Sequence, residues 1–251
     1  MKKIFLSACF CISLSSLFSQ DLNKLSLNFY SGTKILSPSL NEDWPIRQDV
    51  SYGYGGGYNA QVNLNGDLFY FGVSPEYLIN KHWSISSGLR FSQYLSSVVK
   101  ADYDRGGYFF LRVSQEDTQT DFARIKAIRE RSSFIGIPWE IKYTPFVFGR
   151  FDLHAKLTAE LAYRLKNRTD IEFKEAMMDA YQTTVLREIG IKSNPWFTAA
   201  SLSLGARLRL SKQVYLSYDI FMPAFYMTKN NSSLVNVDNV GGFQLSIDWS
   251  L

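Results

Sequence analysis

The sequence is poor in cysteine and histidine, and it lacks a long apolar run beyond its first twenty residues. Its two cysteines, Cys9 and Cys11, lie close to the N-terminus. If an N-terminal segment that contains both is removed, the remaining chain forms no disulfide and no thiolate zinc site. No later stretch approaches the roughly 18 consecutive apolar residues that a membrane-spanning helix needs. The sequence therefore excludes a disulfide scaffold and a helical membrane protein.

The charge balance and the scarcity of histidine exclude further classes. The net charge of +4 arises from 27 basic and 23 acidic residues. These are mixed along the chain, and nothing resembles the basic patch of a nucleic-acid-binding protein. The two histidines, His82 and His154, are distant in the chain, and no ligand spacing predicts a metal site. We expect no nucleic acid, metal or cofactor as a partner.

The beginning of the chain predicts export. Two lysines precede an apolar segment, and a small residue, Ser19, follows it. We predict that residues 1–19 are a signal peptide cleaved near Ser19 and Gln20, and that residues 20–251 form a single domain. Lipidation of Cys9 is an alternative that the sequence leaves open, although only about five apolar residues precede it, against the roughly 7 to 15 expected.

The rest of the chain is dominated by segments in which apolar and polar residues alternate. The clearest one ends at Leu210; every second residue is leucine or alanine, and Arg207 and Arg209 share the opposite face. A period of two is typical of a two-faced strand, and roughly 9 to 11 residues of tilted strand cross a bilayer. We predict strands over residues 22–31, 67–79, 83–97, 132–143, 151–165, 197–210, 214–227 and 240–251.

The connections between these strands alternate in length. Short turns span residues 80–82, 144–150 and 211–213, long connections span residues 32–66, 98–131 and 166–196, and residues 228–239 are intermediate. Outer-membrane barrels have short turns on the periplasmic side and long loops outside. The fold class predicted is therefore all-β, an antiparallel up-and-down transmembrane β-barrel of eight strands. Ten strands are the alternative, with an added hairpin over residues 51–64.

Aromatic residues at the strand ends favour this barrel over a soluble β-sandwich. They fall at Trp83, Phe146, Phe148, Phe151 and Trp249 on the short-turn side, and at Tyr94, Tyr163 and Tyr226 on the other. Two aromatic girdles around an apolar band are typical of a transmembrane barrel.

Two segments also resemble a known family. Residues 83–92 (WSISSGLRFS) and 134–143 (FIGIPWEIKY) are similar to the third and fourth strands of the outer-membrane β-barrel domain family typified by PorT and common in Bacteroidota. In that family of OmpA-like small barrels, a strand with isoleucine-proline and then lysine-tyrosine follows a strand with glycine-leucine. The resemblance implies a barrel in the cell outer membrane. It allows a secretion-associated role and implies no single activity.

The inward faces of the predicted strands carry many charged side chains. The interior of an eight-stranded barrel is just wide enough for side chains to fill, and buried charges persist when they are paired. We predict an ion-pair network in a filled lumen; a narrow water-filled pore is the alternative. The predicted members of the ion-pair network are Glu76, Arg90, Glu140, Lys142, Asp152, Lys156, Glu160, Arg164, Arg207, Arg209, Asp219 and Asp248.

We predict no enzyme activity and no catalytic residue. His82 falls in a short turn next to Trp83, and His154 falls near the periplasmic end of an inward face beside Asp152. A catalytic histidine needs a nucleophile within hydrogen-bond reach and access for substrate. Both histidines lie at the wrong end for a substrate outside the cell.

The long connections are where a specific function is expected. Residues 169–172 (TDIE) form a capping-box pattern, and apolar residues at helical spacing follow as far as Tyr181. We predict a short amphipathic helix over the barrel mouth, which either shields the lumen or binds a partner. Basic residues beside the fourth predicted strand either contact lipopolysaccharide phosphates or form a solvated face. These residues are Arg124, Lys126, Arg129 and Arg131.

Two classes of function remain. The first is a structural or interaction component of the cell envelope, which is surrounded by outer-membrane lipid and binds an envelope protein through the long connections. The second is a small passive transport pore. The sequence does not decide between them.

Overall fold

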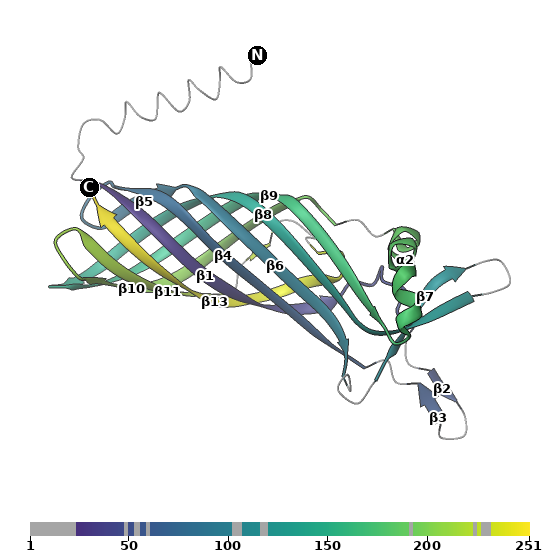
Figure 1. Ribbon diagram of the computed structural model, residues 1–251. Coiled ribbons are helices and arrows are strands. Elements are labelled where there is room, and N and C mark those ends of the chain that lie inside the picture. The colour runs from purple at the N-terminus through teal and green to yellow at the C-terminus, as the bar shows by residue number, and fades with distance from the viewer. Residues whose placement is uncertain are drawn as a thin grey trace, which may run out of the picture.

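The computed structural model describes residues 24–47, 50–52, 56–58, 61–101, 107–115, 120–190, 193–222, 225–226 and 232–251. They form a long barrel of tilted antiparallel strands (Figure 1). At the short-turn end, the last strand finishes beside the start of the first; at the opposite end, which we call the loop end, lie a helix and two hairpins. The predicted signal peptide, residues 1–19, lies outside the described residues.

The described strands fill eight positions of one closed ring, which confirms the predicted fold class. All neighbours pair antiparallel, and β1 closes the ring because it pairs with both β13 and β4. In ring order the strands are β1 (Leu25–Leu40), β4 (Val62–Leu78), β5 (Trp83–Ser87) with β6 (Leu89–Lys100), β8 (Thr120–Phe148), β9 (Phe151–Phe173), β10 (Trp196–Arg209), β11 (Val214–Phe221) with β12 (Phe225–Tyr226), and β13 (Val235–Ser250).

The ten-strand alternative is wrong for the described residues. The expected extra hairpin exists as β2 (Val50–Tyr52) and β3 (Gly56–Tyr58), but these strands form a separate two-stranded sheet. A further strand, β7 (Phe109–Gln115), folds back on the beginning of β8. Both hairpins lie beyond the loop end of the barrel (Figure 1).

The strands continue well past the predicted boundaries at the loop end. β8 begins at Thr120 rather than at residue 132, and β9 ends at Phe173 rather than at residue 165. Much of the predicted connections 98–131 and 166–196 is therefore strand. The predictions stopped where the outward side chains cease to be apolar, whereas backbone pairing does not depend on which side chains face outward. At the other end, the predicted turn 144–150 is also mostly strand, since β8 continues to Phe148.

The predicted capping box is wrong, although a helix does follow it. Residues 169–172 belong to β9, and the helical segment comprises the 3-10 helix η3 (Ala176–Tyr181) and α2 (Gln182–Ile189). Helix α2 ends at Gly190, which adopts the left-handed conformation favoured by glycine. Its Val185 is buried in the same apolar cluster as Phe109, so α2 packs onto the β7 hairpin.

The outward face of the barrel is apolar and exposed. In β8, Ile135, Ile137, Trp139 and Ile141 are 42 to 47% exposed, while the residues between them are buried. A sheet with such an outer surface needs a lipid environment, and closure leaves no unpaired strand edge within it. Among the described residues, no helix combines the length and apolar character needed to cross a membrane.

Aromatic pairs mark both edges of this apolar band. The ring centroids of Trp83 and Tyr143 are 4.6 Å apart at the short-turn end, and those of Tyr163 and Trp196 are 4.9 Å apart toward the loop end. Tyr94 was predicted to belong to the second girdle, but its side chain is buried in the lumen. It is four residues from the inward residue Arg90 on the same strand, so it points to the same side of the sheet. The side chain of Tyr226 lies outside the described set.

We predict that Gly88, between β5 and β6, tolerates no side chain. A Cβ atom there would lie 2.0 Å from the carbonyl oxygen of Val73 in β4, whereas one at Gly241 in β13 meets nothing within 4 Å. We expect Gly88→Ala to lower the stability of the barrel by about 1 to 3 kcal/mol, as overpacking typically does. Gly241→Ala is the matched control. The measurement is the fraction of folded barrel at increasing urea concentration, read from the heat-modifiable band on gels. Equal unfolding midpoints for the two variants would contradict the prediction.

Candidate functional site

A buried arginine stands at the centre of the lumen. Arg90 donates hydrogen bonds to Glu160 at 2.8 Å and to Glu140 at 3.2 Å, and all three side chains are less than 5% exposed. The guanidinium carbon of Arg90 lies 4.6 Å from the ring centroid of Tyr70 and 5.0 Å from that of Tyr30. Two carboxylates and two aromatic faces therefore surround this one cation.

The neighbouring positions of Arg90 on adjacent strands are glycines. Gly72 in β4 and Gly136 in β8 are its cross-strand partners. A Cβ atom at Gly72 would lie 2.5 Å from the ring of Tyr30, and one at Gly136 would lie 2.7 Å from Ala162. Gly72 thus leaves space for the ring of Tyr30, and Gly136 leaves space for Ala162 of β9.

A second cluster shares Glu140 with the first. Lys156 lies 3.0 Å from the carboxylate of Asp219 and 3.9 Å from that of Glu140. The other oxygen of Asp219 lies 2.7 Å from Nε2 of His154. His154 lies on the inward face of β9 two residues from Asp152, as predicted, and its hydrogen-bond partner is Asp219. The two clusters form one continuous network across the lumen.

Nearer the short-turn end, two further ion pairs fill the barrel. Lys142 donates to Glu76 at 2.7 Å, and the hydroxyl of Ser84 donates to the same carboxylate at 2.5 Å. Arg207 donates to Asp152 at 2.9 Å. Asp248 accepts a hydrogen bond from Ser217 at 3.0 Å.

Two predicted members of the lumen network lie elsewhere. Arg164 is at the loop side of the apolar band, where its guanidinium bonds to the hydroxyl and the carbonyl oxygen of Ser193. Arg209 is exposed at the last residue of β10, over the ring of Tyr215. Both share the alternation of the network residues, but Arg164 lies within β9 on the loop side of the ion pairs, and Arg209 is the last residue of β10.

Sequence reasoning missed three inward charged residues, of which Lys100 is 8% exposed at the end of β6 and donates to the carbonyl oxygen of Gln61 at 3.1 Å. Lys34 is 1% exposed, with its ammonium group 5.0 Å from the ring centroid of Phe221. Glu130 is also 1% exposed. All three fall in segments predicted as long connections.

The sequence carries a signal for Glu130 but none for Lys34. Residues 33–36 are Thr-Lys-Ile-Leu, which do not alternate and give no signal for Lys34. Glu130 has the same alternation as Phe134 and Glu140, so extending the predicted strand by two residues from its start at residue 132 would have found it.

Glu130 fastens a segment across the mouth of the barrel. Its carboxylate accepts hydrogen bonds from the N–H of Ser233 at 3.0 Å, the N–H of Leu234 at 3.1 Å and the hydroxyls of Ser232 at 2.9 Å and Ser233 at 2.7 Å. The carbonyl oxygen of Ser233 in turn accepts from the Trp44 indole at 2.7 Å.

Apolar side chains fill the lumen around this segment. Leu68, Val98, Phe134, Phe197 and Leu234 belong to one buried cluster. The lumen therefore has two halves with different contents: ion pairs toward the short-turn end, and an apolar core toward the loop end.

Beyond the mouth, extended strands and a helix build what we call the platform. It consists of β7, the first part of β8, the last part of β9, and helices η3 and α2 (Figure 1). One face of the platform carries the rings of Tyr108, Phe110 and Phe122, which touch edge to face. Basic side chains lie over these rings: Lys174 is 3.9 Å from the Tyr108 centroid, and Arg47 is 5.4 Å from that of Phe122.

The four basic residues predicted beside the fourth strand have different surroundings. Arg124 pairs with Glu175 at 2.6 Å, and Arg129 pairs with Glu172 at 2.7 Å. Lys126 is half-buried next to the register shift in β8. Arg131 is exposed.

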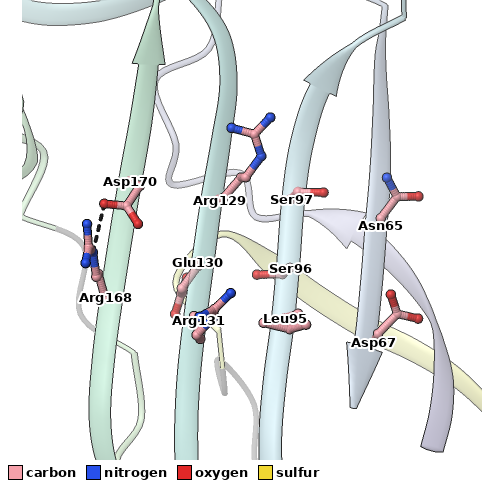
Figure 2. A pocket seen from close by; sticks show the side chains of 10 residues that line it. All are labelled: Asn65, Asp67, Leu95, Ser96, Ser97, Arg129, Glu130, Arg131, Arg168 and Asp170. Atoms are coloured by element: carbon pink, nitrogen blue, oxygen red, sulfur yellow. Dashed lines mark hydrogen bonds and ion pairs between the residues drawn. The ribbon is translucent and has the colours of Figure 1, made fainter. Parts of the chain in front are cut away.

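Arg129 and Arg131 line a groove of about 400 Å³ on the outer wall of the barrel. Its lining residues come from β4, β6, β8 and β9 (Figure 2). The residues that line it are Asn65, Asp67, Leu95, Ser96, Ser97, Arg129, Glu130, Arg131, Arg168 and Asp170.

Comparison with known proteins yields structural likenesses at low sequence identity. No protein-family model and no curated protein sequence matches the chain. The outer membrane protein OprG from Pseudomonas aeruginosa is 10% identical, with a TM-score of 0.45 over 89% of this chain and 94% of its own. Neisserial surface protein A is 12% identical, with a TM-score of 0.39 over 91% and 97%. The attachment invasion locus protein Ail of Yersinia pestis is 10% identical, with a TM-score of 0.33 over 90% and 96%. These values carry no inference about this chain, and the PorT-like resemblance stays a prediction.

We predict that the lumen network stabilises the barrel through Arg90. Arg90→Met leaves Glu140 and Glu160 buried without their principal partner, which typically costs about 3 to 5 kcal/mol. Arg209→Met, at an exposed position, is the control and should change stability by less than about 0.5 kcal/mol. The measurement is urea unfolding in detergent micelles, followed by tryptophan fluorescence.

The triple variant Arg90→Met, Glu140→Gln, Glu160→Gln tests whether the loss comes from unpaired charge. It should recover part of the stability, because no uncompensated carboxylate remains around position 90. A triple variant less stable than Arg90→Met alone would show that the loss has another origin.

Proposed function

We propose that the protein is an outer-membrane anchor whose filled, non-conducting barrel holds the platform outside the cell, where the platform binds a protein partner of the envelope. The observation that carries this proposal is the content of the lumen. Ion pairs occupy one half, and an apolar core fastened by Glu130 occupies the other. A barrel filled in this way is suited to anchoring rather than to transport.

The outer membrane is the location that best fits the chain. The predicted export segment takes it across the inner membrane, and the exposed apolar band of a closed barrel requires a bilayer. Short turns at one end and long connections at the other favour an orientation with the platform outside. The family resemblance adds a secretion-associated role to the proposal.

The platform offers the surface for a partner. Aromatic and arginine side chains are enriched at the centres of protein interfaces, and the Tyr108, Phe110 and Phe122 face combines both. Met177 and Tyr181 of η3 are also exposed, at 79% and 58%. We propose that these rings form the contact and that the surrounding cations favour an acidic partner.

Catalysis is not part of the proposed function. His154 and Asp219 resemble the base and the orienting acid of a hydrolase, but their side chains are 2% and 1% exposed inside the filled lumen. A substrate outside the cell has no route to this pair through the apolar core.

We predict no channel activity in planar bilayers. The purified protein should give no conductance steps at any salt concentration, because the lumen of an eight-stranded barrel filled by side chains holds no continuous water path. A porin reconstituted under the same conditions is the positive control. Steps whose size rises with salt concentration would support the passive pore instead.

We predict that the platform, and not the barrel wall, contacts the partner in cells. A photo-crosslinking residue in place of Phe122 should trap a specific envelope protein, and Phe110→Ala should reduce that product several-fold. The photo-crosslinking residue in place of Leu157, which is exposed in the apolar band, is the matched control and should trap no envelope protein. Identical products from both positions, with the heat-modifiable shift intact, would contradict the proposal.

A further inference from the structure

The groove on the outer wall lies where the apolar band ends. Cross-strand register arranges the outward residues of β4, β6, β8 and β9 in rows. Successive rows toward the loop end are Phe71, Phe91, Ile135 and Tyr163; then Phe69, Gln93, Ser133 and Lys166; then Asp67, Leu95, Arg131 and Arg168; then Asn65, Ser97, Arg129 and Asp170. The outer surface thus changes from apolar to basic within three rows.

The height of the arginine rows matches the headgroup layer of a bilayer. Rows are two residues apart, and a rise of about 3.3 Å per residue at a tilt of about 40° makes each step about 5 Å along the membrane normal. On β8 itself, Ile135 is the last exposed residue of the apolar band toward the loop end. Arg131 is four residues further along the strand, about 10 Å along the membrane normal, which places it beyond the hydrocarbon layer, at the outer side of a headgroup layer of roughly 5 to 8 Å per leaflet.

The groove presents guanidinium groups on one side and, on the other, side-chain oxygens that can accept hydrogen bonds from hydroxyl groups. Arg129 and Arg168 are oriented by Glu172 and Asp170, at 2.7 Å and 2.9 Å. Arg131 stands between them in the rows, and among the described residues it has no hydrogen-bond or ion-pair partner. A guanidinium fork matches phosphate oxygens in a bidentate manner. On β4, two strands away, Asn65 and Asp67 offer oxygens that accept hydrogen bonds from sugar hydroxyls.

We propose that this groove binds the headgroup of a phosphorylated glycolipid of the outer leaflet. Arg131 is the principal phosphate contact, Arg129 and Arg168 complete the basic side, and Asn65 and Asp67 hold the sugar. The site rests on the proposed orientation of the barrel, with the loop end outside, and it is independent of the platform and its partner. Of the four basic residues predicted to contact lipopolysaccharide phosphates, the proposed site includes Arg129 and Arg131, because Arg124 and Lys126 lie outside the groove.

The test measures lipid binding by the purified full-length protein in detergent, by native mass spectrometry. The probes are lipid A with both phosphates, the same lipid without phosphates, and inorganic phosphate as a competitor. We expect the phosphorylated lipid to bind, the phosphate-free lipid to bind at least tenfold more weakly, and millimolar inorganic phosphate not to displace the bound lipid.

Variants locate the site. Arg131→Glu should weaken binding of the phosphorylated lipid at least tenfold, and Arg131→Gln should weaken it less. Arg112→Glu, which changes an exposed arginine of β7 outside the groove, should leave it unchanged. Heat-modifiable mobility confirms that each variant is folded.

Three results would overturn the proposal. Equal binding by Arg131→Glu and Arg112→Glu would place the lipid elsewhere. Equal binding of the two lipids would remove the role of phosphate, and displacement by inorganic phosphate would make the groove a free-anion site. Failure of the platform to crosslink a partner would leave all three readouts unaffected, so the two proposals fail separately.

Discussion

Hydrogen bonding of the backbone within lipid is the constraint on which the whole structure depends. The hydrocarbon layer offers no water to an unpaired strand edge, so the sheet must close, and β1 closes it by pairing with the last strand, β13, on one side and with β4 on the other. Closure then separates an outer face from an inner one. The outer face must be apolar, and the inner face must fit an interior only wide enough for side chains.

The two halves of the lumen satisfy this limit in different ways. Around Arg90, Gly72 leaves space for the ring of Tyr30, and Arg90 pairs with Glu140 and Glu160 within hydrogen-bond distance. Toward the loop end, an apolar core replaces the ion pairs, and Glu130 uses its carboxylate to hold backbone N–H groups of residues 233 and 234. Desolvation penalises buried charges in both halves, and the ion pairs of Arg90 and the hydrogen bonds of Glu130 offset part of that cost.

The extended strands connect the membrane to whatever lies outside it. β8 runs without interruption from the short-turn end into the platform, so the platform is a continuation of the barrel wall rather than a set of loose loops. The same strand carries the apolar band, the basic rows of the groove and the aromatic face in succession. A strand that crosses three environments explains why its outward residues change character while its backbone pairing does not.

The sequence by itself determined the fold class and the strand alternation, because a period of two is a local property that each strand displays alone. It also indicated ten of the twelve predicted lumen charges, since inward orientation follows from that alternation. The tertiary structure determined the position of each side chain along the barrel and its partner, which the alternation does not indicate. Arg164 and Arg209 have the right parity, but Arg164 lies within β9 on the loop side of the ion pairs, where it bonds to Ser193, and Arg209 is the exposed last residue of β10. Lys34 lies in a stretch that does not alternate, so its inward orientation depends on the pairing of β1 with β4 and β13. The partnership of His154 with Asp219, and of Arg90 with two glutamates from different strands, depends on the register of several strands around a closed ring, which no single segment of sequence displays.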